Sequence, residues 1–310
     1  MNTANSEQTC VFSIIVGYVS TTDREQIINT INALFQQDGQ LGYEVIIATR
    51  KIDAICRKLC LSYPGIKIAL CDEGSPLPAM HTTALNHALG EYVVVTEDHC
   101  VPTKDWLLNI QRAFLEAPAN TVAIGGCVEN GVVERPLDWA TFLCEYGAFM
   151  QPVTEGLTTT LPGMNIAYKR NVIAEIDKTS LRSGFWEQTL HPRLLDMGLC
   201  FVSSNAVKVS HCKTFSFLFF AKQRYLYSRY FGAMRAKKLN YVYRLFYLII
   251  TVYLPVLFMY RLSRHMFVKR NFIREFLLAS PILLIFFVIA AGGEAIGLML
   301  GDKDSLLRIE

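Results

Sequence analysis

The amino-acid sequence predicts an α/β domain built on a parallel sheet, followed by apolar helices that associate with a membrane. Short apolar runs alternate with amphipathic segments through roughly the first hundred residues, a pattern typical of βαβ units. The fourth run ends in three adjacent side chains that can bind a metal ion, Glu97, Asp98 and His99. Two apolar stretches close the chain, and each exceeds the roughly 20 residues that cross a bilayer.

Composition limits the class of protein further. The 310 residues suffice for one large domain or two modest ones, and a formal net charge of +3 is too small to predict a nucleic-acid-binding protein. Residues 1–9 are polar and lack the basic start and apolar core of a secretory signal. The nine cysteines form no CxxC pair, which argues against a zinc cluster or a disulfide framework and suits reduced thiols in a cytosolic domain.

The elements of the first domain follow from the hydrophobic pattern. Each predicted strand is an apolar run, and each predicted helix repeats apolar residues every three or four positions. Strands and helices that alternate at this spacing predict a parallel sheet covered on both faces. No GxGxxG sequence follows the first strand, which argues against the dinucleotide-binding fold of dehydrogenases. The predicted strands are Val11–Val16, Tyr43–Ala48, Ile66–Leu70 and Tyr92–Thr96, and the predicted helices are Asp23–Gln37, Asp53–Tyr63 and Met80–Leu89.

The middle of the chain has a less regular pattern. Thr121–Val133 has the composition of a strand that Gly125 and Gly126 interrupt. Phe185–Gly198 predicts a short helix, and Phe201–His211 predicts an alternating strand that ends in a histidine.

The triplet after the fourth strand has two interpretations. The carboxyl edge of an open α/β sheet is where ligands bind, and two carboxylates with an imidazole suit a divalent cation that holds a diphosphate. In the alternative interpretation the triplet is a turn, with Asp98 capping a helix that begins near Lys104.

The two closing stretches, Tyr241–Leu262 and Phe276–Leu300, predict membrane association. Aromatic residues crowd the start of the first stretch, as expected at a headgroup interface. The alternative is a pair of buried helices in a soluble domain, although Pro255 and the pair Gly292-Gly293 are better tolerated in membranes. Five basic residues, Arg261, Arg264, Lys269, Arg270 and Arg274, lie at the end of the first stretch or between the two stretches. A spanning hairpin would therefore violate the positive-inside tendency, and one stretch lying in the interface is the other possibility.

Several short sequences together resemble the family 2 glycosyltransferases, which have the GT-A fold. The similarity runs from about Val11 to Phe231, and each piece is weak alone, whereas their order and spacing are specific. The pieces are Ala88-Leu89-Gly90-Glu91-Tyr92, Thr96-Glu97-Asp98-His99-Cys100-Val101-Pro102, Gly125-Gly126, Pro162-Gly163-Met164-Asn165 with Ile166-Ala167-Tyr168-Lys169-Arg170, and Trp186-Glu187.

The resemblance implies a domain organisation and a fold. The fold expected is a GT-A, Rossmann-like nucleotide-diphospho-sugar transferase domain at residues 1–212. A basic and aromatic juxtamembrane helix follows at 213–240, then two apolar membrane segments within 241–300 and a polar tail at 301–310. The basic and aromatic helix would hold a diphosphate or lipid phosphate, or would anchor the chain in anionic lipid.

The resemblance also implies roles for individual residues. Glu187 matches the family's catalytic base, although a carboxylate at a helix start also complements the helix dipole. A Mn²⁺ or Mg²⁺ ion would be bound by Asp98, His99 and His211, with His99 standing where the family has an acid. His211 is also consistent with a plain surface histidine. The expected contacts to the donor and its diphosphate are Glu97, Asp98, His81 and Asp72, and those to the acceptor or the sugar are Asn165, Trp186 and Arg193; Asn165 is also consistent with a turn residue.

The departures from the family pattern concern the nucleotide. Thr49 and Arg50 stand where the family has base-reading aspartates, and Asp53 or Asp72 would have to substitute. The function that follows is inverting transfer of a hexose-like sugar from a nucleotide-sugar to a lipid-linked or saccharide acceptor at the cytoplasmic face of the cell membrane. Its partners would be the donor, the acceptor and membrane lipids, with no nucleic acid. The alternatives are a catalytically inactive membrane scaffold of the same fold and a nucleotidyltransferase.

Overall fold

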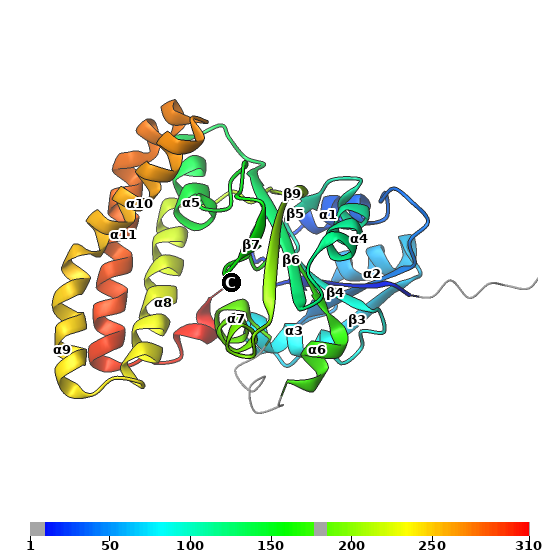
Figure 1. Cartoon of the computed structure of the whole chain (residues 1–310), viewed down its shortest axis with the longest axis horizontal. Coiled ribbons are helices and arrows are strands. Elements are labelled where there is room, and N and C mark those ends of the chain that lie inside the picture. Colours follow the sequence, from blue (N-terminus) through cyan, green and yellow to red (C-terminus); the bar gives the residue numbers. More distant parts are fainter. Residues whose placement is uncertain (1–9, 177–184, 310) are drawn as a thin grey trace, which may run out of the picture. The chain divides into compact units, whose positions relative to one another are not determined.

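The structure, a computed structural model, describes residues 10–176 and 185–309. The chain divides into two compact units (Figure 1). Unit 1 comprises Met1–Glu129 and Val153–His211 and is built on a sheet, whereas unit 2 comprises Asn130–Pro152 and Cys212–Glu310 and is helical.

Within the described residues the sheet has nine strands, in the order β3-β2-β1-β4-β8-β6-β9-β5, with β7 paired to β9. Strands β1 to β4 run parallel, as the alternation of strands and helices predicts, and β8 then joins β4 in the antiparallel direction. The strands are β1 Phe12–Tyr18, β2 Tyr43–Thr49, β3 Ile66–Leu70, β4 Tyr92–Glu97, β5 Cys100–Pro102, β6 Thr121–Asn130, β7 Gly156–Thr158, β8 Ile166–Lys169 and β9 Cys200–His211.

Helices cover the sheet because its central strands are apolar on both faces. One face places Ile15 and Val93 against Met80 of α3, Ile173 of α6 and Leu190 of α7. Helix α3, Leu77–Leu85, begins and ends earlier than the sequence predicts. It can begin before Met80 because a proline is tolerated in the first turn, where the backbone N–H has no partner within the helix. The helices of unit 1 are α1 Gln26–Leu34, α2 Ala54–Ser62, α3 Leu77–Leu85, α4 Trp106–Glu116, α6 Arg170–Glu175 and α7 Glu187–Asp196.

The predicted interruption at Gly125 and Gly126 is wrong, because β6 runs through both glycines. A Cβ on Gly126 would lie 2.0 Å from the carbonyl oxygen of Val207, and one on Gly125 would lie 2.8 Å from that of Asn165. The glycines therefore permit close approach of neighbouring backbone within a continuous strand.

Unit 2 consists of α5 Pro136–Tyr146, α8 Phe217–Ala236, α9 Tyr241–Ile250, α10 Leu254–Lys269 and α11 Ile273–Leu300. A 3₁₀ turn at Thr251–Tyr253 separates α9 from α10. Tyr241–Lys269 and Ile273–Leu300 are long and apolar enough to cross a membrane, by length and composition. Helix α11 packs along α8, α5 and α10, and Figure 1 shows α8 and α9 on opposite sides of it.

Candidate active site

A group of metal-binding side chains lies at the carboxyl edge of the sheet. Glu97 is the last residue of β4, and the chain turns through Asp98 and His99 into the short strand β5. Strand β5 pairs antiparallel with β9, and the register places Cys100 opposite His211. This pairing brings His211 to His99, with 3.0 Å between their Nε2 atoms.

The geometry of this group fits a metal ion. His99 Nε2 lies 3.1 Å from Glu97 Oε2, and one ligand atom from each of Glu97, His99 and His211 falls within 4.8 Å of the others. Two ligands bound to one ion at about 2.0–2.1 Å lie roughly 3 Å apart, which matches these separations. The donor set of one carboxylate and two imidazoles suits Mn²⁺ better than Mg²⁺, which prefers oxygen ligands.

Asp98, also predicted as a metal ligand, is not one of the three side chains whose ligand atoms come together in this group. Its Oδ2 accepts hydrogen bonds from the backbone N–H groups of Val19 and Ser20, at 3.0 and 2.9 Å. Its Oδ1 accepts from the Ser20 hydroxyl and lies 2.6 Å from His99 Nδ1. Asp98 therefore fixes the ring of His99 so that Nε2 faces Glu97 and His211. The alternative role of Asp98 as the cap of the next helix is wrong, because Asp105 is the residue that precedes α4.

The surroundings of His99 favour positive charge. Burial alone would lower the pKa of its imidazole, but hydrogen bonds and charge from Asp98 and Glu97 outweigh burial and raise the pKa above its ordinary value. A position that stabilises an imidazolium by negative neighbours also attracts a divalent cation.

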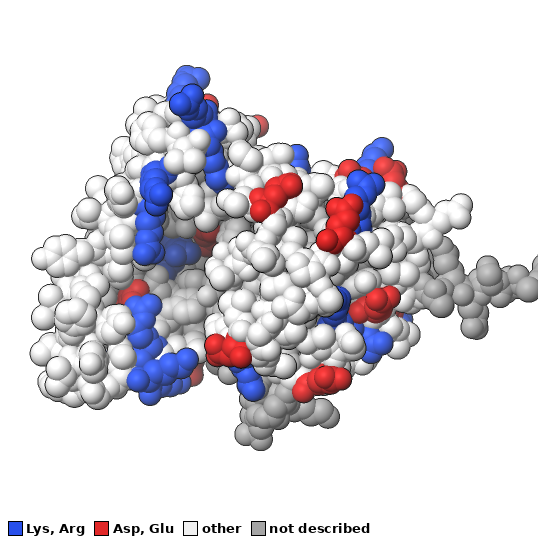
Figure 2. Space-filling model, viewed as in Figure 1, with Lys and Arg blue, Asp and Glu red and all other residues white. Residues whose placement is uncertain are grey.

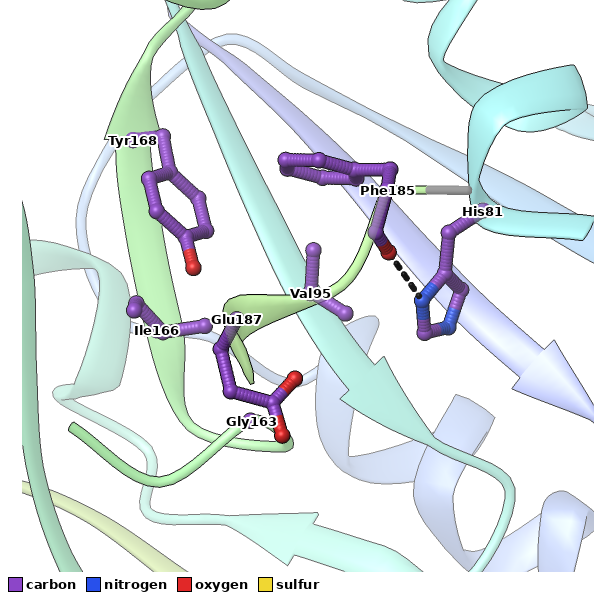
Figure 3. A pocket seen from close by; sticks show the side chains of 7 residues that line it. All are labelled: His81, Val95, Gly163, Ile166, Tyr168, Phe185 and Glu187. Carbon is purple, nitrogen blue, oxygen red and sulfur yellow. Dashed lines mark hydrogen bonds between the residues drawn. The ribbon is translucent and has the colours of Figure 1, made fainter. Parts of the chain in front are cut away.

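A small pocket opens on the same side of the sheet (Figure 3). Glu187, the first residue of α7, points its carboxyl group into this pocket and lies over Gly163. A Cβ on Gly163 would come within 2.8 Å of that carboxyl, so only glycine leaves this room. The lining residues are His81, Val95, Gly163, Ile166, Tyr168, Phe185 and Glu187.

The pocket shifts the pKa of Glu187 into the range that suits a general base. Burial raises the pKa of its carboxyl to about 7, and the negative charge of Glu97 adds to the rise. A carboxyl group with a pKa near neutral pH can accept a proton and release it again under physiological conditions.

His81 faces the pocket as a neutral ring. Burial lowers its pKa to about 4. Its Nδ1 lies 3.4 Å from the carbonyl oxygen of Phe185, which can only accept a hydrogen bond, so Nδ1 carries the proton. The buried Nε2 is then an acceptor without a hydrogen-bond partner among the described residues. It lies close to Gly17, near the carboxyl end of β1, because a Cβ added to that glycine would be 3.0 Å from it.

Tyr168 and His191 support the pocket and were not singled out in the sequence. The hydroxyl of Tyr168 lies 2.8 Å from Nε2 of His191. Burial lowers the pKa of His191 to about 4, so a neutral ring shares this hydrogen bond with the hydroxyl. The alternation within Ile166–Lys169 would have placed Tyr168 on one face of a strand, but its histidine partner comes from α7.

Asn165, predicted to contact the acceptor or the sugar, is held inside unit 1. Its side chain is completely buried, and its amide donates to the carbonyl oxygens of Cys127 and Val207. Its Oδ1 accepts from Trp106 Nε1 at 2.8 Å. Both donors and the acceptor are thus used inside unit 1, where Asn165 ties β6, β9 and α4 together.

The remaining predicted residues belong to other parts of unit 1. Arg193 is exposed in the last turn of α7, six residues after Glu187, and successive 100° steps place it on a different helix face. Asp72 is exposed after β3, three strands from β4, which amounts to roughly 14 Å. Trp186 is half-buried and directly precedes α7.

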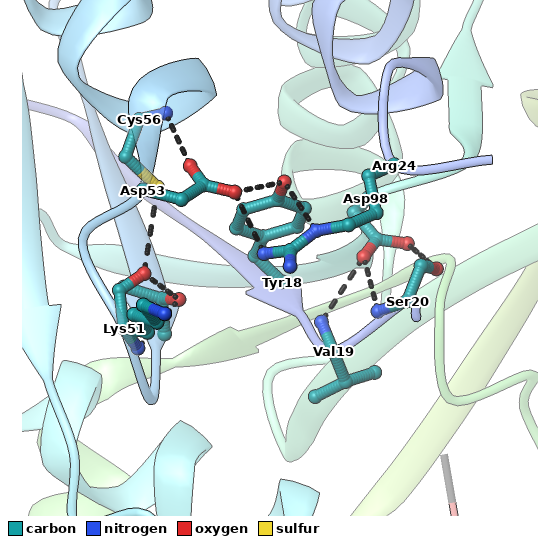
Figure 4. A network of polar contacts seen from close by, with 9 residues as sticks. Tyr18, Val19, Ser20, Arg24, Lys51, Asp53, Cys56 and Asp98 are labelled. Carbon is teal, nitrogen blue, oxygen red and sulfur yellow. Dashed lines mark hydrogen bonds and ion pairs between the residues drawn. The ribbon is translucent and has the colours of Figure 1, made fainter. Parts of the chain in front are cut away.

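Asp53, proposed as a substitute base-reading residue, is committed elsewhere (Figure 4). Its carboxylate caps α2 by accepting from the N–H of Cys56, and it accepts from the Tyr18 hydroxyl. It also forms a 2.7 Å ion pair with Arg24. The carboxylate therefore joins the ends of β1 and α2.

The sequence profile of "Glycosyl transferase family 2" matches residues 13–177, more than half of the chain and most of unit 1. The chain belongs to this glycosyltransferase family. The nucleotidyltransferase alternative is set aside on this ground. No curated protein sequence matches the chain.

Solved structures agree on the fold of this family 2 glycosyltransferase. The mannosyltransferase PcManGT from Pyrobaculum calidifontis, in complex with GDP-Man and Mn²⁺, has 17% identity and a TM-score of 0.55, and the match covers 92% of this chain and 86% of that one. The first 349 residues of TarS from S. aureus, in complex with UDP-GlcNAc, have 16% identity and a TM-score of 0.49, over 72% of this chain and 65% of that one. At such identity the likeness to PcManGT establishes the GT-A fold alone.

Proposed function

We propose that this glycosyltransferase is an inverting, metal-dependent enzyme that moves a sugar from a nucleotide-sugar to a hydroxyl of a lipid-linked or saccharide acceptor at the cytoplasmic membrane face. The observation that carries the proposal is the carboxyl group of Glu187. It lies in a pocket on the sheet's carboxyl edge, its pKa is raised to about 7, and the charge of Glu97 in the metal-binding group reaches it.

Glu187 would act as the general base. Its carboxylate takes the proton of the acceptor hydroxyl while the acceptor oxygen forms a bond to the anomeric carbon. The bond from that carbon to the diphosphate breaks on the opposite face, so the configuration inverts and a nucleoside diphosphate leaves. A positioned base of this kind contributes about 10²–10⁴-fold to the rate.

Glu97, His99 and His211 would hold the ion, with Asp98 orienting His99. When bound, the ion would supply Lewis-acid stabilisation of the departing diphosphate. Mn²⁺ is the better match to the two imidazoles, and PcManGT, which shares the fold, is described with Mn²⁺ and GDP-Man.

His81 would recognise the donor through its unprotonated Nε2. A neutral acceptor cannot pair with a phosphate oxygen, but it accepts a hydrogen bond from a hydroxyl of the donor sugar or its ribose. The carboxylate of Glu97 would also contact the donor. Asp72, at the far edge of the parallel strands, would contact the nucleotide base, and Trp186 and Arg193 remain proposals for the acceptor side.

The test is a panel of nucleotide-sugars, including GDP-mannose and UDP-N-acetylglucosamine, offered to the purified full chain with Mn²⁺ or Mg²⁺. Release of nucleoside diphosphate is the measurement. We expect turnover with at least one donor, and faster turnover with Mn²⁺.

Glu187→Gln should abolish that turnover while the donor still binds, since the amide keeps the shape and cannot accept the proton. Glu116→Gln, on the exposed face of α4, is the matched control and should behave as the parent chain. Normal turnover in Glu187→Gln would overturn the assignment of the base, and donor binding without turnover in the parent chain across the panel would favour the inactive scaffold.

A further inference from the structure

Helix α8 of unit 2 begins beside the middle of α11, the most apolar helix of that unit. The strand β9 ends at His211, residues 212–216 form neither helix nor strand, and α8 begins at Phe217. The ring of Phe217 stacks on that of Phe286 with 5.3 Å between centroids, and Phe220 contacts the same ring at 4.7 Å. Phe286 is the fourteenth of the 28 residues of α11.

Charged groups gather at the same level. The guanidinium of Arg135 donates to the carbonyl oxygen of Phe215 at 3.2 Å and forms an ion pair with the buried carboxylate of Asp138. The ammonium of Lys213 lies 5.3 Å from the centroid of the Phe215 ring. If α11 crossed a bilayer upright, this irregular backbone and these charges would stand near the hydrocarbon midplane, where lipid-exposed loops do not occur.

The second half of α11 has a charged companion. A Cβ on Gly293 would lie 2.5 Å from the carbonyl oxygen of Tyr225, and one on Gly297 would lie 2.0 Å from that of Arg229, so α8 and α11 touch through their backbones. Helix α8 carries Arg224, Arg229 and Arg235 at this contact. Arg224 pairs with Glu145 of α5, and Arg235 pairs with Glu294 of α11 itself. A spanning α11 would carry these charges into the membrane with it.

The exposed surfaces of α9, of the first turns of α10 and of α11 are apolar by contrast, and exposed basic residues on α10 begin only at Arg261. On α11 the exposed large side chains recur at helical spacing, as Leu277, Leu284 and Val288. From α9 through the 3₁₀ turn to the start of α10, one stripe of exposed apolar residues at helical spacing comprises Val242, Phe246, Ile249, Tyr253, Val256 and Tyr260, and exposed Arg264 ends it. No partner covers these stripes among the described residues, so unit 2 is amphipathic as a whole, with charged α8 behind apolar outer helices.

Basic residues stand at both ends of the apolar helices. Lys237 and Lys238 are exposed between α8 and α9, and Arg270 and Arg274 are exposed at the turn between α10 and α11. Figure 2 shows the outer edge of α9 and α10 without charge, and blue side chains inward of that edge along the length of the helices. A spanning hairpin would place one of these basic groups on the far side of the membrane, against the positive-inside tendency.

We infer that unit 2 lies in the plane of one leaflet and that α11 does not cross the bilayer. The apolar stripes of α9, α10 and α11 would enter the leaflet by roughly 5–10 Å, and the basic groups at both ends would contact anionic phospholipid headgroups of that leaflet. The inference rests on the membrane location in the proposed function and adds its topology. It places the turn at residues 270–272 on the same side of the membrane as unit 1.

Protease protection tests this topology on the full chain bound to preformed vesicles of phosphatidylcholine and phosphatidylglycerol. A recognition site for a sequence-specific protease is inserted after Asn271, which is exposed. The same site placed before Met1 is the matched control. We expect both sites to be cleaved at similar rates in intact vesicles, whereas a spanning hairpin protects the inserted site until detergent is added. Protection of the inserted site alone overturns the in-plane arrangement and leaves the proposed membrane location standing.

A chain that fails to bind these vesicles overturns the membrane location as well.

Depth-dependent quenching of tryptophan fluorescence keeps the inference testable if the insertion disturbs folding. Single variants Leu277→Trp, Leu284→Trp and Met299→Trp place a fluorophore at exposed positions along α11. Lipids brominated near the headgroup should quench all three similarly. Strongest quenching of Leu284→Trp by lipids brominated near the chain ends would show that α11 spans.

Discussion

Gly163 offers a way to move the proposed base without changing its chemistry. The Cβ of Gly163→Ala would lie 2.8 Å from Cδ and Oε2 of Glu187 and 3.0 Å from Oε1. Ordinary contacts of a Cβ begin at 3.4 Å, so the carboxyl group must retreat by at least the difference, about 0.6 Å. A displacement approaching 1 Å costs a catalytic group about 10²-fold, and we expect kcat to fall roughly 10- to 100-fold.

The same variant should barely affect folding. Gly163 does not have the positive φ that disfavours alanine, and the atom it displaces is the far end of a flexible side chain. We expect the free energy of unfolding to stay within about 0.5 kcal/mol of the parent value and the Kd of the donor to stay within about twofold. Gly65→Ala is the control, because a Cβ there meets nothing within 4 Å and φ is again not positive.

The measurements are nucleoside diphosphate release for kcat, donor titration for Kd and thermal unfolding for stability. Full activity in Gly163→Ala, together with an inactive Glu187→Gln, would show that the carboxyl position over Gly163 is not the one that reacts. A large loss of stability in Gly163→Ala, absent from Gly65→Ala, would mean that the pocket is rigid and that the fall in kcat reports misfolding.

Three further outcomes follow from the site. Because the pKa of Glu187 is raised to about 7 and the base acts when deprotonated, kcat/KM should rise with pH through about 7 and fall roughly fivefold from pH 7 to pH 6, measured at saturating metal. His211→Ala should weaken Mn²⁺ binding at least about tenfold in a titration of free Mn²⁺ by electron paramagnetic resonance, whereas His87→Ala, at an exposed position, should not. Asn165→Ala should lower the free energy of unfolding by about 3 kcal/mol in a denaturant titration, since it leaves Trp106 Nε1 without its acceptor, and any chain that still folds should bind donor normally.

The first four strands could be predicted from the sequence because each is buried by its own composition. Apolar runs such as Tyr92–Thr96 need no knowledge of their neighbours to be assigned as strands, and the alternation with helices fixes the parallel direction. The position of Glu97 at the carboxyl edge follows directly. The local pattern is therefore sufficient wherever the fold is built from consecutive βαβ units.

The pairing of distant segments could not be predicted in the same way. His211 reaches His99 only because β5 pairs with β9, more than a hundred residues farther along the chain, and three residues of β5 carry too little pattern to name their partner. The buried position of Asn165 could not be predicted for a related reason. A polar residue in a loop sequence is as consistent with a ligand contact as with a buried tie, and only the backbones of β6 and β9 decide between them.

The replacement of a carboxylate by His99 makes physical sense once Asp98 is seen to face the backbone. Asp98 keeps its negative charge behind the imidazole, hydrogen-bonded to Val19 and Ser20, and contributes no ligand atom to the group. The three ligands then carry one negative charge, from Glu97, and two neutral rings. An ion held by fewer charged ligands would keep more of its own charge and would attract the diphosphate of the proposed donor more strongly. On the proposed mechanism, the histidines would therefore suit a borderline ion such as Mn²⁺ and would leave it a stronger Lewis acid than an all-carboxylate group would.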